Sequence, residues 1–90
     1  MEKGNLVIAT KGKEKNQYFV ILSIDNKFAY IVDGKRLKTV NPKKKNLKHI
    51  QKASKEKLSD IVLDDKNARV NMAIRKFIKE EKEKICQKMM

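Results

Sequence analysis

The sequence contains one cysteine, one proline, three glycines and no tryptophan in 90 residues. The single cysteine, Cys86, excludes an internal disulfide and is typical of a chain kept in a reducing compartment. Residues 1–5 do not have the apolar core of a signal peptide. The longest apolar run, Tyr18–Leu22, is far too short to span a bilayer. These features predict a cytoplasmic protein that has no membrane partner.

Residue types that support catalysis or metal binding are equally scarce. A metal site needs several converging nitrogen, sulfur or oxygen ligands, and His49 and Cys86 lie in different parts of the chain. Nucleophilic catalysis needs a nucleophile, a base and an orienting group, and His49 lies among lysines without such a set. The carboxylate pair Asp64-Asp65 is interpreted as a polar loop before a helix, because acids favour helix N-termini. We therefore expect no enzyme activity, no catalytic residue, no metal and no cofactor.

Positive charge is abundant: the formal net charge is +12 and the pI is about 9.9. Residues 1–53 carry 13 Lys or Arg against 4 Asp or Glu, whereas residues 54–90 carry 10 against 7. Residues 35–52 contain 8 Lys or Arg and no acid. Lysine outnumbers arginine 20 to 3, which favours contacts with phosphate over base reading. The first part therefore predicts an anionic partner, and the unmixed run predicts a phosphate-facing surface. The alternative is a set of lysines that protects an edge strand.

Apolar runs rich in Val, Ile, Phe and Tyr predict three strands, Leu6–Ala9, Tyr18–Ile24 and Phe28–Val32, with a turn at residues 25–27. The second strand is apolar on both alternations apart from Ser23, so both of its faces need a cover. We expect a barrel interior on one face and a C-terminal helix on the other.

Asp33-Gly34 predicts a tight hairpin, with Arg36–Val40 as the returning strand and Pro42 ending it. The second half of Lys43–Ile50 would supply a fifth, closing strand. Five short strands within about fifty residues predict an SH3-like barrel over residues 1–52.

Residues 53–90 predict a helical extension packed on the barrel. Ser54 is the expected N-cap of a short helix that runs through Leu58 to about Leu63. A second helix is expected from Ala68 or Asn71 to Lys88. Its apolar stripe is Val70, Ala73, Ile74, Phe77, Ile78 and Ile85. The predicted fold is thus mainly β with an α tail, a small five-stranded barrel followed by two C-terminal helices.

The loop Gly12-Lys13-Glu14-Lys15-Asn16 and the strand after it resemble the KOW motif of ribosomal and transcription-associated proteins. Glu14 stands where the motif usually has Asp, which we expect to matter little. Asn16 stands where the motif has its second Gly. Because Asn tolerates a left-handed backbone, we expect Asn16 to have a positive φ.

The Asp33-Gly34 pair and the tract Lys43–Ile50 extend this resemblance to small bacterial KOW-domain RNA-binding proteins, which are similar to a large-subunit ribosomal protein of archaea and eukaryotes. The resemblance covers residues 4–52. It implies an SH3-like barrel and binding to RNA. The implied partners are a structured RNA, ribosomal RNA above all, and a ribosomal, transcription or translation protein.

The candidate RNA contacts are cations of the first loop and of the basic tract, and the helical tail is expected to contribute little. Tyr18 is interpreted as a core residue first, and is the better placed of the two tyrosines to stack on a base. His49 is either a partly buried barrel residue or an RNA contact. Alternative functions are an SH3-like module that binds an acidic protein and a nonspecific DNA-binding protein. The candidate RNA-binding residues are Lys11, Lys13, Lys15, Tyr18, Lys35, Arg36, Lys43, Lys44, Lys45, Lys48 and His49.

Overall fold

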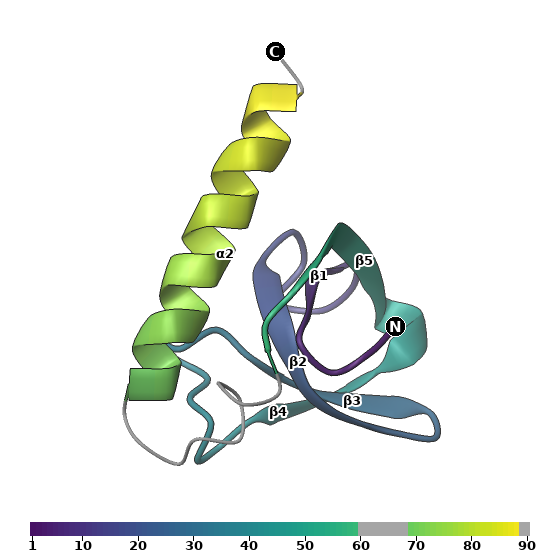
Figure 1. Ribbon diagram of the computed structural model, residues 1–90. Helices are drawn as coiled ribbons and strands as arrows, with labels where there is room; N and C mark the ends of the chain where they lie inside the picture. Colours follow the sequence, from purple (N-terminus) through teal and green to yellow (C-terminus); the bar gives the residue numbers. More distant parts are fainter. Residues whose placement is uncertain (60–68, 89–90) are drawn as a thin grey trace.

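A computed structural model describes residues 1–59 and 69–88, and Figure 1 shows a curved sheet beside one long helix. All strand pairs are antiparallel, and the sheet order is β4-β3-β2-β1-β5. The elements are β1 (Asn5–Ala9), β2 (Tyr18–Asp25), β3 (Phe28–Val32), β4 (Lys43–Asn46), the 3-10 helix η1 (Leu47–His49), β5 (Ile50–Lys57) and α2 (Arg69–Lys88). The fold is therefore mainly β, with one α-helix among the described residues.

The first three predicted strands are confirmed as β1, β2 and β3. Their apolar residues fill two separate clusters on the two faces of the sheet. On one face, β1, β2, β3 and β5 bury Val7, Ala9, Phe19, Ile21, Ala29, Ile31 and Ile50. On the other face, Leu6, Val20 and Val32 pack against Val70 and Ile74 of α2. The alternation along β2 thus sends Phe19 and Ile21 to the first cluster and Val20 to the second. A strand that is apolar on both alternations is covered on both faces, as expected.

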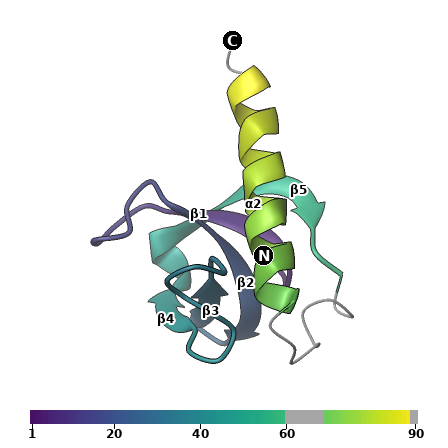
Figure 2. The ribbon, with the colours of Figure 1, turned by 90° about the vertical axis from the view of Figure 1, so that its left-hand side faces the viewer.

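Figure 2, which views the molecule from the helix side, shows α2 in front of the sheet. Its predicted apolar stripe is confirmed: Val70 and Ile74 are fully buried, and Phe77, Ile78 and Ile85 pack at the margin of the second cluster. This contact stabilises the molecule because it removes apolar surface on both partners from water.

The predicted strand Arg36–Val40 is wrong, and the first residue after β3 explains why. The carboxylate of Asp33 accepts hydrogen bonds from the backbone N–H groups of Lys35 and Leu37, both at 2.9 Å. The N–H groups of Asp33 and Gly34 in turn donate to the Leu37 carbonyl. These bonds close the chain into a compact loop, so its backbone groups have partners without a ladder. Pro42 then precedes β4 instead of ending a strand.

This β3–β4 loop (residues 33–42) is also tied to α2. Gly34 is buried with φ +79°, and a Cβ atom added there would lie 2.3 Å from the Asn71 carbonyl oxygen. The Asn71 side chain accepts a hydrogen bond from the Thr39 N–H at 3.0 Å. Asp33-Gly34 therefore serves as a close-packing point for a helix and not as a hairpin turn.

The predicted N-cap at Ser54 is also wrong, because residues 50–57 form β5. This strand pairs with β1, from Ala9↔Ile50 to Asn5↔Lys57, and so crosses the boundary that we placed between residues 52 and 53. Its sequence IQKASKEK has no apolar alternation, since β5 is an edge strand and most of its side chains are exposed. The rest of the predicted short helix, residues 60–63, lies outside the described residues, as does Asp64-Asp65.

The expectation for Asn16 is confirmed. It is the one non-glycine residue with positive φ that the structure shows in residues 1–59 and 69–88, at φ 72°. Its N–H donates to the Ala9 carbonyl at 2.8 Å, which closes the β1–β2 loop (residues 10–17).

Candidate functional site

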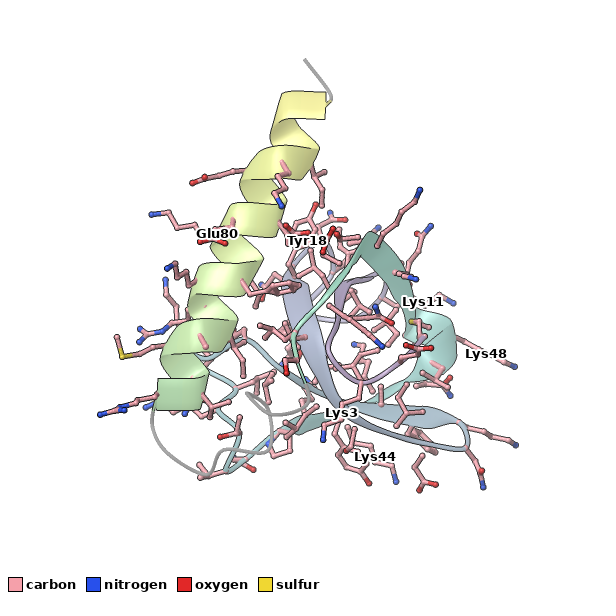
Figure 3. All side chains as sticks on the ribbon, viewed as in Figure 1. Lys3, Lys11, Tyr18, Lys44, Lys48 and Glu80 are labelled. Carbon is pink, nitrogen blue, oxygen red and sulfur yellow. The ribbon has the colours of Figure 1, made fainter. Side chains whose placement is uncertain are left out.

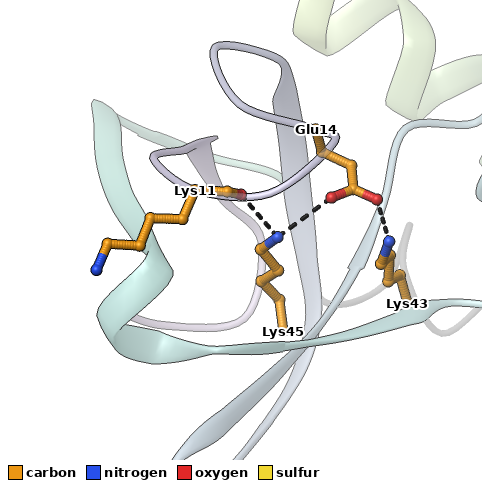
Figure 4. Close-up of polar contacts among 4 residues, drawn as sticks. All are labelled: Lys11, Glu14, Lys43 and Lys45. Atoms are coloured by element: carbon orange, nitrogen blue, oxygen red, sulfur yellow. Dashed lines mark hydrogen bonds and ion pairs between the residues drawn. The ribbon is translucent and has the colours of Figure 1, made fainter.

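Two lysines of the basic tract are bound to the β1–β2 loop instead of facing solvent freely. Lys43 and Lys45 project from the same face of β4, and both reach the carboxylate of Glu14 (Figure 4). Lys43 Nζ bonds Glu14 Oε1, and Lys45 Nζ lies 3.2 Å from Oε2. Lys45 also donates to the Lys11 carbonyl at 2.9 Å and is buried. The three side chains therefore hold the β1–β2 loop against β4.

Glu14 is the centre of this arrangement. The hydrogen bond from Lys43 is the main cause that lowers its pKa from 4.5 to about 2, Lys45 adds to the effect, and burial opposes it. Glu14 is thus ionised at neutral pH. Its carboxylate neutralises two cations of the tract, Lys43 and Lys45.

We expect the Glu14 ion pairs to make folding stability depend on pH in the acid range. The pKa of Glu14 is lower in the folded chain than in the unfolded one. The pairs therefore stabilise fully above about pH 4.5, and their contribution is lost as pH falls toward about 2. Glu14→Gln should cost roughly 1–2 kcal/mol at pH 7 and much less at pH 2, measured by urea denaturation at each pH.

The matched control is Glu83→Gln, which removes an exposed carboxylate from α2 and should change stability little at either pH. A Glu14→Gln deficit of equal size at pH 7 and pH 2 would contradict the role assigned to the ion pairs.

The remaining tract residues point in other directions. Lys44, on the opposite face of β4, places its ammonium 4.2 Å from the centroid of the Phe28 ring. Lys48 is exposed and His49 is half-buried. Figure 3 shows Lys11 and Lys48 on the side of the molecule away from α2, with Lys44 at the lower edge. The tract is continuous in sequence, but the structure does not assemble it into one phosphate-facing surface.

A groove of about 620 Å³ opens between α2 and the two loops. Tyr18 lies on the helix side of the sheet in Figure 3, at the wall of this groove. The sheet side of the groove is lined by Asn16, Gln17, Tyr18, Asp33 and Lys35. The helix side is lined by Met72, Arg75, Lys76, Ile78, Lys79 and Lys82.

A smaller hollow of about 200 Å³ adjoins the groove, since Gln17 and Asp33 line both. It brings together Lys13 of the β1–β2 loop, Arg36 of the β3–β4 loop and Lys43 of β4. Five predicted site residues therefore meet along one surface. These are Tyr18 and Lys35 in the groove, and Lys13, Arg36 and Lys43 in the hollow. Lys11, Lys15, Lys44, Lys45, Lys48 and His49 line neither.

The groove is strongly positive. Lys35, Arg75, Lys76, Lys79 and Lys82 are all exposed cations on its rim. The acidic residue that lines the groove is Asp33, and its carboxylate already accepts two backbone hydrogen bonds. A concave surface with one sign of charge focuses its field and concentrates ligands of the opposite sign.

A comparison of charges along the chain does not reveal the four helix cations Arg75, Lys76, Lys79 and Lys82. Lys79 and Lys82 alternate with Glu80, Glu81 and Glu83, a pattern that predicts a solvent-exposed surface with charges of both signs. The helix removes one of these acids, Glu81, from the surface. Glu81 turns inward, is 4% exposed, and accepts a hydrogen bond from Ser54 Oγ at 2.7 Å.

Arg75, Lys79 and Lys82 recur at intervals of four and three residues, so they share one flank of α2. Assigning each charge to its helical angle, instead of to its place in the sequence, would have revealed this flank.

The described part of the chain shows no group of three His, Cys, Asp or Glu side chains that could hold a metal ion. Its one α-helix is not long and apolar enough to cross a membrane. No protein-family model matches the sequence, and comparison with curated proteins finds no match. The function is therefore inferred from the residues and their arrangement.

Proposed function

We propose that this chain is a non-enzymatic RNA-binding protein of the KOW type, which binds a structured RNA in the cytoplasm. Ribosomal RNA is the first candidate, with a ribosomal, transcription or translation protein as a neighbour. The observation that carries the proposal is that exposed cations from separate segments converge on one surface: Lys13, Lys35 and Arg36. The acids beside them, Glu14 and Asp33, are already engaged by lysines and backbone N–H groups.

The course of the sheet supports the finer proposal of an SH3-like barrel. The register shift between Ile21 and Ser23 marks a bulge with one extra residue in β2, and the β1–β5 pair shifts register between Asn5 and Val7, with the extra residues in β5. Bulges bend strands and increase twist, which lets a short sheet curl around a core. The first hydrophobic cluster lies on one face of this curved sheet, as the core of such a barrel would.

The revised role of the basic tract strengthens the phosphate-binding interpretation of the loops. Lys43 and Lys45 fix the β1–β2 loop through Glu14, so Lys13 is carried on a braced loop. Lys35 and Arg36 are carried on a loop that Asp33 and Asn71 brace. A rigid set of point charges matches the fixed phosphate positions of a folded RNA.

The test is the salt dependence of binding to a structured ribosomal RNA fragment. Each phosphate contact contributes a slope of about −0.7 to −0.9 in log K against log salt. The triple variant Lys13→Gln, Lys35→Gln, Arg36→Gln should therefore bind more weakly and flatten the slope by about two units. The control variant is Lys27→Gln, Lys52→Gln, Lys55→Gln. It removes the same charge from exposed positions outside the groove and the smaller hollow, and it should leave the slope nearly unchanged.

Equal losses in both triple variants would show an effect of net charge and reject this surface. If neither variant lost affinity while an acidic protein partner stayed bound after ribonuclease treatment, the protein-interaction function would replace the proposal. Equal competition by duplex DNA would replace it with DNA binding. Replacing Lys43, Lys44 and Lys45 together is a poor test, because it also removes the partners of Glu14.

A further inference from the structure

We propose that the groove between α2 and the β1–β2 loop binds an unpaired, single-stranded segment of RNA, with a base against Tyr18 and phosphates along α2. This inference rests on the proposed RNA-binding function. It adds a second contact site, made chiefly by the helix, that distinguishes unpaired RNA from duplex.

The cations of α2 are arranged to follow a backbone. Arg75, Lys79 and Lys82 lie on one flank of the helix, and the first and last are about 10 Å apart along its axis at 1.5 Å per residue. Lys35 adds a cation on the opposite side of the groove. A row of positive charges along a concave surface is how proteins bind the backbone of single strands.

The groove also offers apolar surface that phosphate binding alone does not need. Tyr18, Met72 and Ile78 line it, and Met72 is 62% exposed although it is a large apolar side chain. A duplex keeps its bases stacked inside and would present mainly phosphates and sugars to this surface. An unpaired base has two free faces and can stack on an aromatic ring.

One face of the Tyr18 ring is accessible to a group from outside the sheet, because a lysine side chain already lies over it. The ammonium of Lys82 lies 5.6 Å from the centroid of its ring, so a cation occupies the ring face when no ligand is present. The flexible Lys82 side chain can move to a phosphate while a base takes its place over the ring. One nucleotide would then satisfy both residues.

Asn16 is a second, independent observation. Its φ of 72° is a conformation that glycine adopts without strain and that the KOW pattern fills with glycine. Its side chain lines the groove and makes no hydrogen bond with the residues that the structure describes. The backbone of Asn16 closes the loop, but its side chain has no such role in the fold, and it places an amide, both donor and acceptor, where base edges would lie.

The experiment measures the dissociation constants of the full chain for two probes: a short single-stranded RNA of mixed sequence, and the same strand annealed to its complement. The variant Arg75→Gln, Lys79→Gln, Lys82→Gln should weaken single-strand binding about tenfold more than the charge-matched Lys27→Gln, Lys52→Gln, Lys55→Gln control. Both variants should affect the duplex equally. Gln has a helix propensity close to those of Lys and Arg, so α2 should persist.

Two single variants test the base contacts. Asn16→Gly should keep or raise the melting temperature and still weaken single-strand binding severalfold. Tyr18→Leu keeps apolar contact with the second cluster and should weaken it about fivefold or more, since stacking is lost. Neither should change duplex binding.

Each contrary result is distinct. If the α2 variant weakened single-strand and duplex binding alike, the groove would respond only to charge, and the inference would fall while the proposed function stood. The inference would also fall, and the proposed function stand, if only the Lys13, Lys35 and Arg36 variant lost affinity for RNA. If the unmodified chain bound neither probe nor structured RNA, the proposed function itself would fall. Binding of a polyglutamate peptide in the groove would then indicate a protein partner.

Discussion

Gly34→Ala is expected to lower the free energy of unfolding by about 3 kcal/mol, because this position combines two costs. The φ of +79° is strained for any residue with a Cβ atom, at about 1–2 kcal/mol. The added Cβ would also lie 2.3 Å from the Asn71 carbonyl oxygen, and backbone cannot move aside as a flexible side chain can. The start of α2 would have to shift, which would loosen the packing of Val70 and Ile74. Urea denaturation of the variant and parent measures the difference.

Gly12→Ala is the matched control for this substitution. Gly12 has a similar φ of +87°, but its added Cβ would lie 2.8 Å from a side-chain atom, Lys45 Nζ, and not close to backbone. Both alanine variants have the backbone strain, but only Gly34→Ala has the clash with backbone. We therefore expect Gly12→Ala to lower the free energy of unfolding by about 1–2 kcal/mol. If both alanine variants lost the same stability, the close approach of Gly34 to α2 would carry no energetic weight.

Ile74→Ala should destabilise the chain by about 3 kcal/mol. Ile74 is fully buried between α2 and the sheet, and truncating such a residue removes apolar contacts and leaves a cavity. Phe77→Ala should cost less, about 1–2 kcal/mol, because Phe77 is only half-buried at the margin of the same cluster. Thermal or urea denaturation of the two variants gives the comparison.

Met72→Ala is the control on the same helix, since Met72 is 62% exposed, and it should stay within about 0.5 kcal/mol of the parent. Equal losses for Met72→Ala and Ile74→Ala would show that α2 does not depend on this packing. Because the groove has α2 as one of its walls, Gly34→Ala and Ile74→Ala should also weaken single-strand binding, whereas Gly12→Ala should affect it less.

The strongly patterned parts of the chain were predictable. Val, Ile, Phe and Tyr runs gave β1, β2 and β3, and apolar spacing gave α2, because burial selects apolar residues at the period of the element. The double-sided apolar character of β2 indicated that both faces are covered. Asn16 could be placed at positive φ because few side chains tolerate that backbone.

The polar parts were not predictable in the same way. Lys43–Asn46 and Ile50–Lys57 form strands although their sequences are mostly charged or polar, because their ladders depend on partner strands and not on their own apolar surface. Residues 36–40 alternate like a strand, but Asp33 and Asn71 bind the backbone of this segment and keep it a loop. Local propensity gives way wherever a side chain from elsewhere satisfies the backbone.

The sequence by itself determined the excess of positive charge, the β-rich N-terminal half and the amphipathic helix, since composition and periodicity belong to the chain alone. Tertiary structure decided which charges lie together on the surface and which pair with one another. Glu14, far from β4 in sequence, binds Lys43 and buried Lys45. The turn of α2 draws Glu81 inward and sets Arg75, Lys79 and Lys82 beside Tyr18. Coulomb interactions act over distances in space, so a charge pattern becomes a binding surface only when folding has chosen the neighbours.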